Sequence, residues 1–214
     1  MVAVSVVVAL VVAGAVAALA AVVAEILAAV ARQAVGDMMF NKISTLVKHL
    51  WLDATDAERA ISPDMLARLT QRVAASEARH TGEIRIYVEA ALPMSYLWRL
   101  GPHNSMAQLV RQRAITLFGK LRVWDLEANN GVLIYLQLAE RRIEIVADRG
   151  LHGHVGGAQW QAMVSSMSAQ FKQGKFEDGL TDALAEVSAL LVAHFPQAAN
   201  ALQTNEMPDE PTLG

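Results

Sequence analysis

The chain has 214 residues, 54% of them hydrophobic, so it can bury one sizeable core and we expect one domain with appendages. Its net charge of -3 gives no electrostatic case for nucleic-acid binding. Cysteine is absent, which excludes disulfides, thiolate metal sites and cysteine-based phosphatase chemistry.

The first segment, residues 1–38, is strongly apolar. Residues 1–24 carry no ionisable side chain, and Glu25 is the first. About 24 helical residues extend roughly 36 Å, which is enough to cross the hydrocarbon core of a bilayer. Basic side chains follow the apolar stretch and none precedes it: Arg32, Lys42 and Lys48. The positive-inside rule then predicts a single N-terminal membrane span with the domain in the cytoplasm.

A second interpretation of this segment stays open. The segment is mostly Val and Ala. A tandem run of glycine codons that is read one base out of frame encodes these two residues. Translation would then start at Met38 or Met39 and yield a soluble cytoplasmic protein.

An amphipathic lead-in helix is expected within residues 39–61. Its apolar side chains repeat at helical spacing: Ile43, Leu46, Val47, Leu50 and Trp51. We expect this stripe to pack on the domain, with a position on a membrane surface as the alternative.

A helix and a strand open the domain proper. Ser62 and Pro63 form a helix start, and the helix should end near residues 80–82. Residues 83–90 then alternate as a strand does, with Ile84, Ile86 and Val88 on one face.

Residues 91–104 form an apolar loop, which we expect to cover a core edge rather than act as a lid. Ser105 caps the next helix, which ends at Gly119. Residues 121–125 are either a short strand or an irregular link.

A β-hairpin dominates the middle of the sequence, in residues 129–154. The run 132–138 is apolar throughout, as in a strand covered on both faces, and residues 143–147 alternate after a short polar turn. The hairpin ends at Asp148, where charged residues and two histidines come together.

Two further amphipathic helices follow, ending at Gly174 and Pro196, and we expect residues 197–214 to be a disordered tail. The order helix, strand, helix, hairpin, helix, helix predicts an α/β protein. We expect a three-layer α/β/α sandwich over residues 62–196, with a mixed sheet and a central β-hairpin.

Four short motifs in this order resemble the TPM-domain family, which includes thylakoid acid-phosphatase-like, photosystem II repair and receptor-accessory domains. They are Thr81-Gly82-Glu83-Ile84, Asn130-Gly131-Val132-Leu133, Ile143-Glu144-Ile145 through Asp148-Arg149-Gly150-Leu151, and the stretch from Phe171 to Leu180. The resemblance covers Pro63 to Pro196 and implies a Rossmann-like fold. It also implies the acid-phosphatase activity and metal binding attributed to some members.

The chain departs from the family pattern. Many members have Asp where this chain has Asn130, and many have Gly where it has Asp148 or Arg149. Some members end in a membrane span, whereas the candidate span here is N-terminal.

Candidate site residues gather near the strand ends. Asp148, Arg149 and Glu83 are the candidate catalytic residues. Asp148, His152, His154 and Asn130 are the candidate ligands of a divalent cation: calcium, magnesium or zinc. The alternative is structural, with Asp148 and Arg149 forming an ion pair and both histidines solvated.

Two functions are consistent with these residues, and no P-loop, HExxH, GxSxG or GxGxxG motif points elsewhere. One is a non-catalytic accessory or assembly domain that binds a membrane-associated partner through the loop 91–104. The other is a metal-assisted phosphomonoesterase. The neutral side chain of Asn130 weakens the metal site and favours the first.

Overall fold

The computed structural model describes Glu25, residues 42–198 and residues 206–214, apart from the side chains of Ala54, His152 and Ser166. Contacts divide the chain into two units, Met1–Thr45 and Leu46–Gly214. The second unit contains the domain. No helix in the described ranges is long and apolar enough to cross a bilayer. The candidate span, residues 1–24, lies outside these ranges.

The described sheet has four strands in the order β3-β2-β1-β4. They are β1 (Ile84–Glu89), β2 (Val132–Gln137), β3 (Arg142–Ala147) and β4 (Thr212–Leu213). β1 pairs in parallel with both β2 and β4, and β2 pairs antiparallel with β3. The expected mixed sheet is therefore present. The hairpin β2–β3 forms one side of this sheet, with β3 as the edge strand, whereas the sequence predicted a hairpin at the centre.

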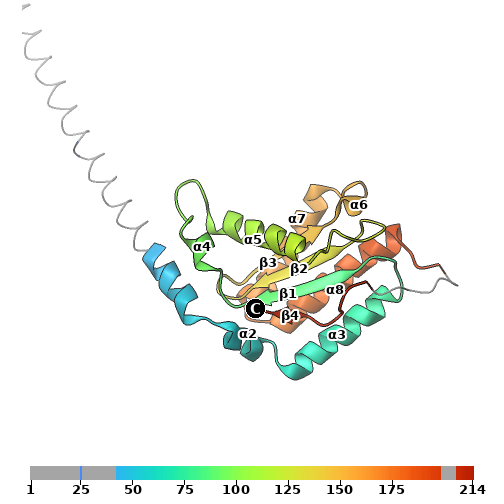
Figure 1. Ribbon diagram of the computed structural model, residues 1–214, viewed down its shortest axis with the longest axis horizontal. Coiled ribbons are helices and arrows are strands. Elements are labelled where there is room, and N and C mark those ends of the chain that lie inside the picture. The colour runs from blue at the N-terminus through green and yellow to red at the C-terminus, as the bar shows by residue number, and fades with distance from the viewer. Residues whose placement is uncertain (1–24, 26–41, 199–205) are drawn as a thin grey trace, which may run out of the picture. The chain divides into compact units, whose positions relative to one another are not determined.

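Helices cover both faces of the sheet (Figure 1). On one face pack α2 (Ala54–Ala60), α3 (Pro63–Glu77), α7 (Gly157–Lys172) and α8 (Phe176–His194). On the other lie α4 (Met94–Leu97) and α5 (Met106–Lys120). The short helix α6 (Arg149–His152) follows β3. The predicted three-layer α/β/α architecture is confirmed.

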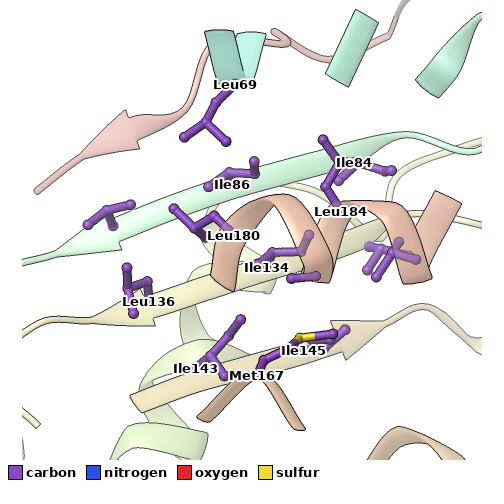
Figure 2. Close-up of a cluster of buried hydrophobic side chains, with 14 of the residues drawn as sticks. Leu69, Ile84, Ile86, Ile134, Leu136, Ile143, Ile145, Met167, Leu180 and Leu184 are labelled. Atoms are coloured by element: carbon purple, nitrogen blue, oxygen red, sulfur yellow. The ribbon is translucent and has the colours of Figure 1, made fainter. Parts of the chain in front are cut away.

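Alternation along the strands builds two cores. Figure 2 shows the larger one, where Ile84 and Ile86 of β1, Ile134 of β2 and Ile143 of β3 face helices α3, α7 and α8. All six residues of β2 are buried, as expected for a strand covered on both faces. Ile134 and Leu136 are both fully buried.

The lead-in helix, residues 42–51, departs from expectation. Leu46 and His49 face the domain, and His49 Nδ1 accepts a hydrogen bond from Leu92 N at 3.0 Å. Large apolar side chains of the predicted stripe instead face solvent, Trp51 at 83% exposure and Leu50 at 64%. The expected packing therefore holds for Leu46 but is wrong for Leu50 and Trp51, because the buried contacts of His49 determine which face turns inward.

The C-terminal residues also differ from expectation. Residues 206–214 are ordered along the sheet edge, and Thr212–Leu213 form β4. The predicted disorder of the tail is therefore wrong for these residues, because main-chain hydrogen bonds to β1 stabilise a segment whose side chains carry no strand pattern. Residues 121–124 form turns, so the link between α5 and β2 is irregular rather than a strand.

Candidate functional site

Three candidate residues lie together where strands of the sheet end. This row of strand ends is called the site edge, as distinct from the lateral edge of β1. The N-terminal ends of β1 and β2 lie beside the C-terminal end of β3, because β3 runs antiparallel to β2. Main-chain hydrogen bonds join these ends, from Val132 N to Glu83 O and from Asp148 N to Gly131 O, both 2.9 Å long. Glu83, Asn130 and Asp148 therefore share this edge.

Glycines allow the backbone to approach closely here. A Cβ on Gly131 would overlap the carbonyl oxygen of Val123, and one on Gly150 would lie 2.5 Å from Asn129 O. Gly150 N also donates to Asn129 O at 2.9 Å. The glycines of these two motifs thus allow backbone segments to pack closely at this edge. This structural role accounts for the two glycines, and no bound ligand is needed to explain them.

Asp148 caps helix α6. Its Oδ1 accepts a hydrogen bond from Arg149 N at 2.7 Å, and the residue is 7% exposed. The Arg149 side chain is exposed, and its Nε donates to Asn129 Oδ1 at 2.8 Å. Among the described residues no salt bridge joins Asp148 to Arg149, so the two interact through backbone capping instead of the expected ion pair.

The two histidines do not complete a described metal site. The His154 ring stacks on His194 at 4.6 Å and meets Phe195 edge-on at 5.8 Å. His152 lies in α6, and its side chain is outside the described set. Among the side chains that are described, no three His, Asp or Glu residues are arranged to hold a metal ion.

Asn130 is buried at 1% exposure, and its Nδ2 donates to Thr81 Oγ1 at 3.2 Å. The side chain thus links the two motifs that precede β1 and β2. This contact gives Asn130 a structural role at the position where the family pattern favours an acid.

Glu83 belongs to an acidic cluster with Glu77, Glu206 and Asp209, in which Glu77 and Glu83 are buried, Asp209 is half-buried and Glu206 is exposed. Glu83 is 3% exposed and Glu77 is 2% exposed. Glu83 Oε1 accepts from Glu206 N at 3.2 Å, and Glu77 Oε1 accepts from Ile84 N at 2.8 Å. Asp209 lies close enough to Glu77 for its charge to raise the pKa of the Glu77 carboxyl group.

Burial is the main cause of the altered acidity in this cluster. It raises the pKa of Glu77 to about 8, and the neighbouring charges of Glu83 and Asp209 push in the same direction. Burial likewise raises the pKa of Glu83 above its ordinary value. The sequence pattern does not identify Glu77 as unusual, because Glu77 lies in a helix. Its acidic neighbours are Glu83, which directly precedes β1, and Asp209 of the tail.

A buried histidine lies next to this edge. His80 Nδ1 is 2.9 Å from Gly82 O and Nε2 is 2.9 Å from Ser76 Oγ. The carbonyl can only accept, so Nδ1 carries the proton and Nε2 accepts from the hydroxyl. Burial lowers the pKa of His80 to about 4, which keeps the ring neutral.

At the opposite end of the sheet, a cluster of polar side chains satisfies its hydrogen bonds internally. Glu89 accepts from Arg113 Nε at 3.1 Å and from Tyr135 Oη at 2.6 Å. Arg113 also lies over the Tyr96 ring, 5.7 Å from its centroid. Both carboxylate oxygens of Glu89 are therefore used inside the fold.

A cleft of about 660 Å³ opens beside β3 and α7, lined by Arg111, Glu144 and Trp160 among others. None of the five candidate residues whose side chains are described lines it. Cleft and candidate site are thus separate features of the molecule.

Comparisons with known proteins agree with this fold. A family model described as the TPM domain matches residues 54–190. The NMR structure of the BA42 protein from the psychrophilic bacterium Bizionia argentinensis is similar, with a TM-score of 0.59 and 24% identity over 72% of this chain and 95% of that one. The N-terminal domain of a protein from P. gingivalis gives a TM-score of 0.49 at 17% identity, over 64% and 82% of the two chains. No curated protein matches the sequence.

Proposed function

The chain belongs to the TPM-domain family, and on that premise we propose that it is a non-catalytic accessory or assembly domain acting on a membrane-associated partner. The observation that carries this proposal is the use of the candidate site residues by the fold itself. Asp148 caps a helix, Asn130 bonds Thr81, and Glu83 accepts from the tail.

The charge at this edge also favours an accessory role. A hard cation needs ionised carboxylates, and the edge offers a neutral amide at Asn130. Burial raises the pKa of Glu83, so this carboxyl group resists the ionisation that a ligand or a nucleophile requires. The residues present fit a divalent cation poorly.

Exposed aromatic side chains support a protein partner. In the loop 91–104, Leu92 and Leu97 are buried and cover a core edge, whereas Trp98 is 69% exposed. Trp51, at 83% exposure, adds a second aromatic ring on the lead-in helix. Tryptophan is enriched at the energetically dominant positions of protein interfaces.

The membrane association proposed for this domain rests on residues 1–24 as a span, with the domain in the cytoplasm. A carbonate wash of membranes from expressing cells tests it, since a spanning protein stays in the pellet. A soluble protein whose first peptide begins at Met38 or Met39 would refute the span.

A metal-assisted phosphomonoesterase is the second candidate, favoured by the convergence of Glu83, Asn130 and Asp148 on one edge. The test is calorimetric titration of calcium, magnesium and zinc into the full-length chain and its Asp148→Asn variant, together with turnover of a phosphomonoester. Asp125→Asn, which alters an exposed surface carboxylate, is the matched control.

The accessory proposal expects no heat of binding and no turnover in any of these proteins. Saturable binding that Asp148→Asn abolishes and Asp125→Asn preserves, with turnover that follows it, would overturn the accessory proposal and establish the phosphatase.

A further inference from the structure

The chain's own tail, residues 206–214, occupies the edge of β1. Tyr87 pairs with Thr212 and Val88 with Leu213 in a parallel register. Gly214 N donates to Val88 O and Ala90 N donates to Gly214 O, both at 2.9 Å. This geometry is strand addition, in which an extended segment extends a sheet by main-chain hydrogen bonds.

Main-chain groups of the tail make many of its contacts, alongside the buried side chain of Met207. The Arg85 guanidinium donates to the carbonyl oxygens of Pro208 and Glu210 and to the hydroxyl of Thr212. A cleft of about 410 Å³ adjoins this contact, lined by Arg85 and Leu126 of the domain and by Glu206, Met207 and Pro208 of the tail. Another extended segment could satisfy the same donors.

The charge of the tail does not complement the surface beneath it. Glu77 and Glu83 are buried where the tail brings two more acids, Glu206 and Asp209. Glu83 Oε2 is buried, and no described residue gives it a hydrogen bond. The negative charge of Asp209 helps to keep Glu77 and Glu83 protonated. A cationic side chain at the position of Asp209 would instead favour the ionised form of both carboxyl groups and pair with them.

We propose that the β1 edge is a second partner-binding surface of this domain, besides the exposed tryptophans of the loop 91–104 and the lead-in helix, and that the partner supplies an extended segment with Lys or Arg where the tail carries Asp209. The partner segment runs parallel to β1 and displaces the tail. This inference rests on the proposed accessory function and gives it a surface and a class of partner.

The connection to α8 allows such an exchange. Gln197 N is bound to Arg79 O at 3.1 Å, and Glu206 N to Glu83 Oε1 at 3.2 Å. α8 and the tail are thus held by different contacts, one at Arg79 and one at Glu83.

The test measures binding of fluorescent peptides to the full-length chain by anisotropy. The peptides are the tail sequence EMPDEPTLG, the variant EMPKEPTLG with Lys at the position of Asp209, and EMPDKPTLG, which has the same charge but Lys at the position of Glu210. Gly214→Val in the chain weakens its own tail as a competitor, because a Cβ there would overlap the Tyr87 hydroxyl.

We expect EMPKEPTLG to bind about tenfold more tightly than either other peptide, with the preference lost in a chain carrying Glu77→Gln and Glu83→Gln. Equal affinity of the three peptides, no binding in the Gly214→Val chain, or a preference that survives in the double glutamine variant would each overturn the proposal. Phosphomonoester turnover would refute the accessory function whatever the peptides do, so the two failures are distinguishable.

Discussion

The buried carboxyl group of Glu77 predicts how stability depends on pH. Its pKa is about 8 in the folded protein, against 4.5 for an ordinary glutamate. Between these values the folded chain holds a proton that the unfolded chain has released, so the free energy of unfolding falls as pH rises. One such proton gives a slope of about 1.4 kcal/mol per pH unit.

His80 works in the opposite direction over a lower range. Its pKa is about 4 when folded, against 6.5 for an ordinary histidine, so between these values the unfolded chain holds the extra proton. Stability then rises with pH and offsets the Glu77 slope up to about pH 6.5. From pH 6.5 to 8 the Glu77 effect stands without this opposition and amounts to about 2 kcal/mol.

Glu77→Gln isolates this effect. The amide oxygen can still accept from Ile84 N, and the substitution removes the ionisable proton. Urea unfolding followed by circular dichroism at half-unit steps from pH 5.5 to 9 should show that the variant loses less stability than wild type above pH 6.5. Glu186→Gln, on the exposed face of α8, should parallel the wild type. Parallel curves for Glu77→Gln and wild type above pH 6.5 would refute the reasoning.

Three substitutions and one control substitution test the fold. Leu136→Ala in the fully buried strand β2 should cost about 2–5 kcal/mol in urea unfolding, and a loss under about 1 kcal/mol would show that the strand is not a core strand. Gly131→Ala, which forces a Cβ onto a backbone carbonyl, should destabilise by about 2 kcal/mol or more, whereas Gly119→Ala in α5, with open space around it, should stabilise by up to about 1 kcal/mol; equal effects would contradict the close approach. Arg113→Ala leaves the Glu89 carboxylate buried without its cation and should lower the thermal midpoint, with a cost of about 3–5 kcal/mol, and an unchanged midpoint would show that Glu89 does not need the pair.

The sequence predicted a helix or strand well where its hydrophobic pattern or its capping residues were clear. Ser62 and Pro63 placed the start of α3, and the apolar run of β2 identified a strand buried on both faces. These features follow from spacing within one segment, which a sequence displays directly. The motif glycines likewise pointed to the edge where three strand ends meet.

Contacts between distant segments left no such signal. The orientation of the lead-in helix depends on His49, whose partners Leu92 and Glu140 are far away in sequence. β4 has two prolines nearby and only two residues, so its strand character comes entirely from β1 and Arg85. The proximity of Glu77 to Asp209 could not be predicted either, since it brings the end of a helix next to the tail.

The sheet order also sets a sequence of events during synthesis. Among the described strands, β1 is made first and its outer neighbour β4 is made last. β1, β2 and β3 can pair before β4 has left the ribosome. Each newborn molecule therefore passes through an interval in which the main-chain groups of the β1 edge are open, a state that invites aggregation. Pairing with β4 ends this interval, so the tail protects the outer edge of β1 from pairing with a second molecule.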